Sequence, residues 1–514
     1  MTRKRILAVV GGFIIATVIV GTTMGGGVAT AADLTHGAIL GHITVSQGVH
    51  VNASALPTGF HASAPVRPAM VRIAPLKSAP SSGTKLGAPA SSATPAPLTT
   101  LTNAFDGIDL ATANCGCQPP DVNAGVGNGY IVETTNLEFG VYDTSGTLIT
   151  SSSLNNFFGT ADGLSDPRVV FDPTWNRWEL SVLDVSSPSL WLLYSQSGDP
   201  TGGWWIYHVA MPFPAGYITD YPNVGMDQNA FVYTTNNFGP SPSYPYVNST
   251  AFLVPKARVY NGFGFSASVP GVAYDTTPAI VGGHPTQIVG QIIMLSPDDA
   301  NNVMNVYSWT STGANPTLTY KGAIAYNWAA PPRRVNQPGT SQTLDPLDGR
   351  IGWSATQLDG RVWFAHGVAI GSFPAVNYGY VTPGSMSITT ASAFQTSTSD
   401  DFNPSISVQS YNGTPQQWLT WAYTDTPNNV PTTDVYALHV GATLAHVGGQ
   451  VYGTAGASTN EYRFGDYSSS VPEYNAVGNC AEGLNALVAN QFFEGNGTWG
   501  THIARVHRAD LCTP

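Results

Sequence analysis

The stretch "LSDPRVVFDPTWNRWELSVL", Leu164–Leu183, contains two runs in which apolar and polar residues alternate. An Asp-Pro-Thr-Trp-Asn turn separates the runs, so the segment predicts a β-hairpin. Asp166, Pro167 and Arg168 stand at the start of this hairpin. These three residues are either turn residues that the fold requires or part of a functional site.

The same arrangement recurs along the chain, since an opening rich in Asp, Asn or Pro repeatedly precedes a strand, a polar turn and a second strand. The openings begin at Pro119, Ser165, Thr219, Tyr274, Leu344, Asp400 and Phe464. Successive openings are roughly 45 to 70 residues apart, which leaves room for four short strands, and such repeats are typical of propeller blades. We therefore predict an all-β fold, a β-propeller of four-stranded blades. The opening at Tyr274 is weak, so six or seven blades both fit.

The interior of such a fold is predicted from its aromatic residues. One four-stranded blade cannot cover both of its faces, so neighbouring blades bury them against each other. No segment keeps a 3.6-residue apolar period, so we expect few helices. The tryptophans expected to fill the space between blades are Trp175, Trp178, Trp204, Trp205, Trp353, Trp363, Trp418 and Trp421.

Composition and the N-terminus indicate an exported protein. Charged residues make up 10% of the 514-residue chain and the net charge is −12, which argues against nucleic-acid binding because that needs basic stripes. A basic start, the apolar run Ile6–Val20 and an Ala-x-Ala site at Ala29–Ala31 predict a signal peptide over residues 1–31. No later segment is apolar enough to span a membrane. We expect a secreted or cell-surface monomer.

The rest of the chain divides into two parts. Residues 32–100 are rich in Ala, Ser, Pro and Thr, which predicts a disordered linker or stalk, although "GAILGHITVSQGVHVNA" within it fits a short strand pair or a prosegment. The propeller domain is expected over residues 101–514. Export makes the four cysteines disulfide candidates, and we favour a Cys480–Cys512 pair. A tight Cys115–Cys117 pair and crossed pairings remain the alternatives.

Several motifs carry a family resemblance. "PPDVNAGVGNGYIVETTNLEFGVYDTSG" resembles the opening of a group of secreted bacterial β-propeller proteins that are distantly similar to sialidases. "SDPRVVFD", "GDPTGGWWIY", "DYPNVGM", "QPGTSQTLDPLDGRI" and "RFGDYSSS" match later landmarks of that group in order. The resemblance covers about 101–514 and implies the fold and export, because the group has no settled activity. The chain departs from the group at "VGNCAEGLNALVANQFF".

Acidic residues recur at the openings and are expected to meet at one mouth of the propeller. They are Asp121, Asp166, Asp220, Asp275, Asp345, Asp401 and Asp466. Three roles compete for them. They form structural turns, they bind a hard cation such as Ca²⁺ through Asp121, Asp345 and Asp401, or a pair of them cleaves glycosidic bonds.

Three arginines near the openings support the alternative that the site is catalytic. Arg168, Arg350 and Arg463 stand beside openings, where converging guanidiniums would clamp a carboxylate as in sialidases. With Asp166, Asp220 and Asp466 they are the candidate catalytic residues, and Tyr221 or Tyr467 would supply a nucleophile. The simpler alternative, which we prefer, is that each arginine pairs with a neighbouring aspartate and locks a turn.

The sequence therefore leaves three functions open. The leading hypothesis is a secreted propeller that binds an extracellular glycan or other polymer at the channel mouth. The second is a glycoside hydrolase, sialidase-like or other, that uses Asp and Arg side chains on the same face. The third is a structural cell-surface interaction protein. Apart from the possible Ca²⁺, no cofactor is expected.

Overall fold

The chain is nearly all β-structure. The structure, a computed structural model, describes residues 35–57, 99–113, 115–282, 290–332, 334–457, 462–475, 478–495 and 498–512. Thirty strands account for most of its regular structure, which confirms the predicted all-β class. The helical segments with described bounds have three to five residues: η1 Ala53–Ala55, α2 Leu110–Ala113, α3 Leu154–Phe158, α4 Lys256–Val259 and η2 Thr426–Asn428.

Strands β3 to β30 fall into antiparallel units of four. Unit 1 consists of β4 Asn123–Gly127, β5 Tyr130–Thr135, β6 Glu138–Asp143 and β7 Leu148–Ser153. Unit 2 consists of β8 Leu164–Asp172, β9 Arg177–Asp184, β10 Ser189–Ser195 and β11 Gly203–Ala210. Unit 3 consists of β12 Ile218–Met226, β13 Ala230–Phe238, β14 Tyr246–Pro255 and β15 Phe265–Val272.

The same pattern continues through the second half of the chain. Unit 4 consists of β16 Thr277–Val281, β17 Gln291–Asp298, β18 Val303–Thr310 and β19 Thr317–Ala325. Unit 5 consists of β20 Ala355–Leu358, β21 Arg361–Ile370, β22 Phe373–Thr382 and β23 Ser387–Ala393. Unit 6 consists of β24 Asp400–Tyr411, β25 Thr414–Asp425, β26 Val430–Val440 and β27 Gln450–Thr454.

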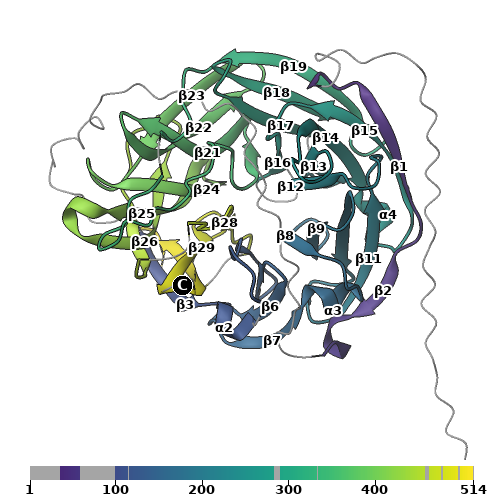
Figure 1. Ribbon diagram of the computed structural model, residues 1–514, viewed down its shortest axis with the longest axis horizontal. Helices are drawn as coiled ribbons and strands as arrows, with labels where there is room; N and C mark the ends of the chain where they lie inside the picture. Colours follow the sequence, from purple (N-terminus) through teal and green to yellow (C-terminus); the bar gives the residue numbers. More distant parts are fainter. Residues whose placement is uncertain are drawn as a thin grey trace, which may run out of the picture.

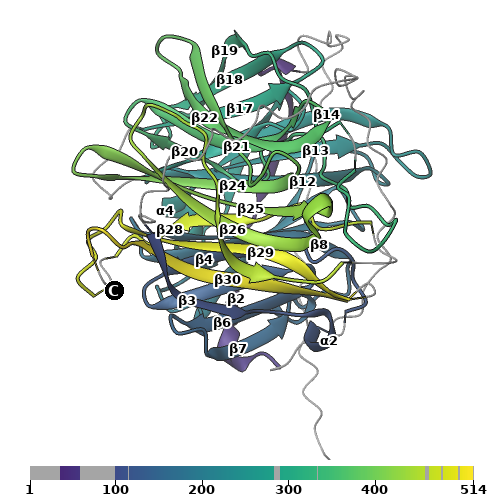
Figure 2. The ribbon, with the colours of Figure 1, turned by 90° about the vertical axis from the view of Figure 1, so that its left-hand side faces the viewer.

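The seventh unit joins the two ends of the domain. It consists of β28 Ser469–Pro472, β29 Asn485–Gly495, β30 Thr498–Arg508 and β3 Thr99–Asp106. Strand β3 comes from the start of the domain and pairs antiparallel with β30, beside which it lies in Figure 2. Backbone hydrogen bonds therefore tie the first ordered strand of the domain to its last.

The units follow one another around a common centre, with their first strands innermost (Figure 1). Short parallel pairings join β12 to β16 and β16 to β20. Because these first strands run in the same direction, the residues that precede them lie at one end of the ring. Each predicted opening contains or directly precedes the first strand of one unit, including the weak opening at Tyr274.

The core lies between neighbouring units. Trp421 packs with Leu358 and Trp363 of unit 5, whereas Trp418 on the opposite face of β25 clusters with Val488 of unit 7. Alternation along the strand thus buries both faces of one sheet. The tryptophans with a relative exposure of 2% or less are Trp178, Trp204, Trp353, Trp363, Trp418, Trp421 and Trp499.

Part of the region expected to be a linker, residues 32–100, forms two strands. Strand β1 Ile39–Val45 pairs with β15, and β2 Val49–Asn52 pairs with β11, so each adds a fifth strand to a unit. Figure 1 shows both along the outer edge of the ring. The predicted alternative of two short strands agrees with the structure better than a linker does. The two strands, however, pair with units 3 and 2 and not with each other. The predicted signal peptide and residues 58–98 lie outside the described residues.

Both cysteine pairs are bonded. Cys480 is joined to Cys512, as favoured, and Cys115 to Cys117. The Cys480–Cys512 bond links the residues before β29 to those after β30. Among the described residues, none of the helices has the length and apolar character needed to cross a lipid bilayer.

The two disulfides are expected to differ in their contribution to stability. The Cys480–Cys512 bond spans 32 residues and the Cys115–Cys117 bond spans 2. A longer closed loop removes more entropy from the unfolded chain, so C480S/C512S should lower the free energy of unfolding by about 2–4 kcal/mol. The matched C115S/C117S variant should lose much less. Equal losses in urea unfolding would contradict this explanation.

Candidate functional site

One unusual backbone conformation recurs where the first strands begin. Asp121, Asp166, Tyr221, Asp275 and Asn403, each from a different unit, have φ between 52° and 56°. Register shifts accompany this conformation in β8, β12 and β24, so Asp166, Tyr221 and Asn403 sit in bulges. Asp and Asn tolerate the left-handed region better than most residues do. Asp121, Asp166 and Asp275 therefore stand at positions where the backbone adopts this conformation, and their predicted role in capping turns stays a prediction.

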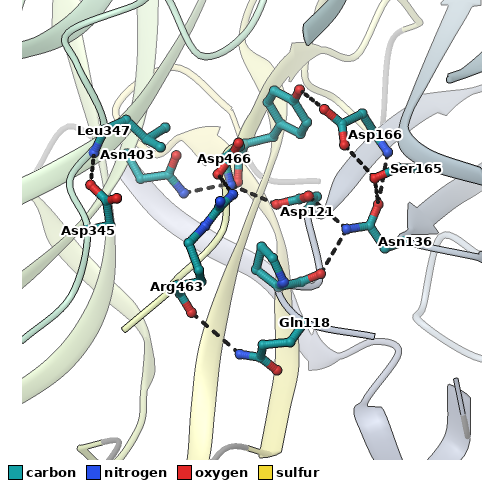
Figure 3. A network of polar contacts seen from close by, with 12 residues as sticks. Gln118, Asp121, Asn136, Ser165, Asp166, Asp345, Leu347, Asn403, Arg463 and Asp466 are labelled. Carbon is teal, nitrogen blue, oxygen red and sulfur yellow. Dashed lines mark hydrogen bonds and ion pairs between the residues drawn. The ribbon is translucent and has the colours of Figure 1, made fainter. Parts of the chain in front are cut away.

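Units 7, 1 and 2 are connected by a chain of polar contacts around Asp121 (Figure 3). The Arg463 guanidinium lies 2.5 Å from Asp466, whose backbone N–H donates to Asp121 Oδ1 at 2.8 Å. Asn136 Nδ2 donates to Asp121 Oδ2 at 2.7 Å. Asn136 Oδ1 in turn accepts from the backbone N–H of Asp166 at 2.9 Å. One asparagine thus bridges Asp121 and Asp166, the positive-φ residues of two successive units.

The chain of contacts continues through two stacked tyrosines. Tyr467 Oη donates to Asp166 Oδ2 at 2.6 Å, and its ring stacks on Tyr221 with a centroid distance of 5.8 Å. Tyr221 Oη donates to the carbonyl of Ile351 at 2.6 Å. Asn403 Nδ2 donates to the Tyr467 carbonyl at 2.9 Å, which adds unit 6 to the network.

Arg168 is a fully buried charge of this region. Its relative exposure is 0%, and its guanidinium carbon lies 3.6 Å from the centroid of the Tyr467 ring. The guanidinium donates to the carbonyls of Pro222 and Gly352 at 2.9 and 3.1 Å and to Asn223 Oδ1 at 2.8 Å. Arg168 therefore binds the backbones of neighbouring units and does not pair with Asp166.

Arg350 completes the network on the side of unit 4. It forms a bidentate ion pair with Asp348, in which Nε and Nη2 lie 2.7 and 2.6 Å from the two carboxylate oxygens. Its Nε also lies 3.9 Å from Asp275 Oδ2. Its guanidinium carbon is 4.3 Å from the Tyr221 ring centroid. Asn236 Nδ2 donates to Asp275 Oδ1 at 2.6 Å, as Asn136 does to Asp121.

We call these connected side chains the mouth cluster. It consists of Asp121, Asn136, Asp166, Arg168, Tyr221, Asn236, Asp275, Asp348, Arg350, Asn403, Arg463, Asp466 and Tyr467. The candidate catalytic residues Asp166, Arg168, Arg350, Arg463 and Asp466 thus meet at one end of the ring. The preferred expectation, that each arginine pairs with a neighbouring aspartate, describes Arg350 and Arg463, whereas Arg168 bonds mainly to carbonyls.

Three of the predicted site residues, Asp220, Asp345 and Asp401, are not members of the mouth cluster. Asp220 is partly exposed, and its charge acts on Asp275 and Tyr467, but Tyr221 holds the bulge position of its unit. Asp345 binds Arg334 at 3.0 Å. Asp401 is fully buried and accepts from Trp421 Nε1 at 3.1 Å, so it belongs to the core between units, and Asn403 takes the bulge.

The predicted cation ligands do not gather into a site. Asp121, Asp345 and Asp401 have the separate protein partners given above. Among the described residues, no group of three or more His, Cys, Asp or Glu side chains has the proximity needed to hold a metal ion. A calcium site stays a prediction from the sequence.

Burial controls the protonation of the mouth cluster. It raises the pKa of Tyr221 and of Tyr467, so both phenols are held neutral and are poor nucleophiles. Burial also raises the pKa of Asp275 to about 7, against the opposing charge of Arg350. Burial thus favours the protonated form of Asp275.

Some members of the mouth cluster were missed by the sequence analysis. Asn136 and Asn236 each end a Thr-Thr-Asn string in the second strand or turn of a unit, and this repeat is visible in the sequence. Asn403 stands two residues from the aspartate that was chosen in its place. Asp348 had no signal beyond its charge.

Comparisons with known proteins give weak structural similarity. No protein family model matches the chain, and no curated protein matches it. The α-L-arabinanase of Penicillium chrysogenum, solved with arabinobiose, is 11% identical over 57% of this chain and 94% of its own, with a TM-score of 0.30. The endo-arabinase of Bacteroides thetaiotaomicron is 11% identical over 55% and 95%, with a TM-score of 0.27. Another glycoside hydrolase has a TM-score of 0.28 at 9% identity over 58% and 91%.

The bulge at Asp166 gives a first prediction for the site. Asp166→Ala puts alanine, which disfavours the left-handed region, at a φ of 56°. It also removes the carboxylate that accepts from the buried Tyr467 hydroxyl. We expect a loss of about 2–4 kcal/mol in the free energy of unfolding. Asp166→Asn should lose less, because asparagine tolerates this conformation and still offers an acceptor.

Asp359→Ala is the matched control for that prediction. Asp359 has a φ of 51° in the exposed turn between β20 and β21, so its variant has a similar backbone cost but lies outside the buried contacts of the mouth cluster. Denaturant unfolding of the three variants separates the two contributions. Equal losses for Asp166→Ala and Asp359→Ala would show that the contacts of the mouth cluster add nothing.

The raised pKa of Asp275 predicts a pH effect. Between about pH 4 and pH 7 the folded chain keeps a proton that the unfolded chain has released, so this group makes the fold less stable as pH rises through that window. Asp275→Asn removes the effect. From pH 5 to pH 8 its stability relative to the wild type should improve by on the order of 1 kcal/mol or more. Denaturant unfolding of the wild type and Asp275→Asn at the two pH values checks this, and a stability difference that does not change with pH would contradict it.

Proposed function

We propose that this chain is an exported β-propeller whose seven units are its blades, and that it binds a neutral glycan at the mouth cluster. Seven consecutive four-stranded units with their first strands inside support the propeller. Two disulfides and the predicted signal peptide support export.

The charges of the mouth cluster favour a neutral ligand. Arg350 and Arg463 each hold a carboxylate of the chain, and the Arg168 side chain is fully buried. An anionic ligand would have to displace Asp348 or Asp466 from these arginines, since a guanidinium already engaged by a carboxylate offers little further attraction. This arrangement differs from the open arginine clamp that a sialic acid would require.

An exposed aromatic ring beside this cluster is the observation that carries the proposal. Tyr462 is 40% exposed and directly precedes Arg463. Its carbonyl accepts from the backbone N–H of Asp345 at 2.9 Å, and Arg334 lies 5.0 Å from its ring centroid. A tyrosine fixed in this way presents an apolar face with a polar tip, which suits the C–H face of a sugar ring.

A glycoside hydrolase is the second candidate, and Asp275 favours it. A carboxyl with a pKa of about 7 has the property of a general acid, and the charge of Asp220 acts on it from the neighbouring unit. Asp220 would then serve as the carboxylate partner. Turnover of chromogenic glycosides that is lost in Asp275→Asn and Asp220→Asn would support this function over binding alone.

Binding to immobilised polysaccharides tests the proposal. The full chain is offered neutral polysaccharides, including arabinan, xylan and β-glucan, and anionic ones such as polygalacturonate and polysialic acid. We expect binding to a neutral polymer, and Tyr462→Ala should weaken it roughly tenfold, which corresponds to 1.4 kcal/mol. Tyr462→Phe should retain most of the affinity because it keeps the ring.

Phe263→Ala provides the matched control. Phe263 is 53% exposed, but it lies in the connection before β15, away from the loop that carries Tyr462. Its removal should leave binding unchanged. Preference for the anionic polymers would contradict the neutral-glycan proposal. Failure to bind any polysaccharide would favour the cell-surface interaction protein instead.

A further inference from the structure

A small cavity on unit 5 is separate from the mouth cluster. It has a volume of about 230 Å³ and lies against the last residues of β21, the middle of β22 and the end of β23. Trp328, from the segment after β19, closes it on the side of unit 4. The cavity is smaller than the roughly 300–1,000 Å³ of pockets for drug-sized ligands, so it suits a group the size of one sugar ring.

The lining of this cavity is uncharged and partly polar. Asn377, Thr390 and Ser392 face it together with apolar side chains and Trp328, and the described lining residues carry no charge. Such a lining offers neither an ion-pairing partner for a charged ligand nor a purely apolar surface. It matches a small neutral molecule with several hydroxyl groups.

A relay of hydrogen bonds fixes the orientation of the Asn377 amide. His366 is fully buried, and its Nδ1 lies 2.8 Å from the carbonyl of Gly349, which can only accept, so Nδ1 carries the proton. Burial lowers the pKa of His366 to about 4, so the ring is neutral and its Nε2 accepts. The Tyr326 hydroxyl donates to this Nε2 at 2.7 Å.

The relay ends at the cavity. Because the Tyr326 hydroxyl donates to His366, its oxygen accepts from Asn377 Nδ2 at 2.9 Å. The amide nitrogen of Asn377 is thereby turned toward Tyr326 and its Oδ1 away from it. Asn377 Oδ1 is a buried acceptor with no hydrogen-bond partner among the described residues.

Trp328, which also lines the cavity, carries a second buried polar atom without a described partner. Its relative exposure is 8%, and its Nε1 also lacks a partner among the described residues. The benzo edge of its indole faces Gly349, where a Cβ would lie 2.5 Å from Trp328 Cζ3. Nε1 is on the opposite edge of the indole, so it points away from Gly349. A buried polar group without a partner costs about 1–3 kcal/mol, which a suitable ligand would recover.

We propose that this cavity binds a single neutral sugar residue, whose hydroxyls donate to Asn377 Oδ1 and accept from Trp328 Nε1. A hydroxyl group is suited to both atoms because it can donate and accept at once. His366 and Tyr326 act as positioning residues that hold the Asn377 amide. The site stands apart from the mouth cluster and does not depend on the function proposed for it.

Nuclear magnetic resonance of the full chain labelled with ¹⁵N-tryptophan tests this site. The probes are methyl β-D-glucopyranoside, methyl β-D-galactopyranoside, methyl β-D-xylopyranoside and methyl α-L-arabinofuranoside, each titrated to about 20 mM, well above a 1 mM dissociation constant. Trp328→Phe assigns the indole signal of Trp328. We expect that signal to shift with at least one probe while the Trp309 signal stays in place.

Variants decide whether the response comes from the proposed contacts. Asn377→Leu should raise the dissociation constant about tenfold, read from the Trp328 signal, and Trp328→Phe should do the same, read by calorimetry. Trp309→Phe is the matched control, because Trp309 also has a buried Nε1 without a described partner but does not line the cavity. It should bind like the wild type. Urea midpoints of all variants show whether each is folded.

The outcomes separate this site from the mouth cluster. Tyr462→Ala should leave the Trp328 response unchanged, even if it abolishes polysaccharide binding. A Trp328 signal that does not move with any probe overturns the proposal. So does a response that Asn377→Leu leaves intact or that Tyr462→Ala removes. If Trp328→Phe does not fold, the Asn377→Leu titration alone decides the question.

Discussion

The architecture depends on how one buried positive charge is accommodated. Arg168 is fully removed from solvent at the centre of the ring, where an uncompensated charge would cost several kcal/mol. The protein surrounds its guanidinium with two carbonyls, an amide oxygen and the face of Tyr467. These partners come from different units, so the need to solvate one charge fixes the positions of several first strands at once.

Compensation within the chain also limits what the arginines of the mouth cluster can bind. Arg350 and Arg463 are engaged by Asp348 and Asp466, and Arg168 donates to two backbone carbonyls. Each of the three guanidiniums therefore already has protein partners, and a ligand carboxylate would have to compete with them.

Much of this could be predicted from the sequence, and the limits have physical causes. The openings were visible because a residue with positive φ recurs near the start of most first strands, and Asp166 and Asp275 are suited to that conformation. It was harder to predict which residue of an opening belongs to the mouth cluster, because neighbouring positions face different surroundings. Asp401 is buried in the core between units, whereas Asn403, two residues later, belongs to the mouth cluster. Contacts such as Tyr467 to Asp166 span 301 residues and leave no local signal. The pairing of β1 with β15 was equally invisible, because alternation predicts a strand but not its partner.

The closure through β3 has a consequence for biosynthesis. The strand made first in the domain completes a sheet whose other three strands are made last, so no nascent chain can seal the ring before its final residues emerge. Until then β3 lacks the strand with which it pairs, and an unpaired strand edge is a template for aggregation. Export in an unfolded state would postpone this closing step until the whole chain has crossed the membrane, where the Cys480–Cys512 bond can then form beside the completed sheet.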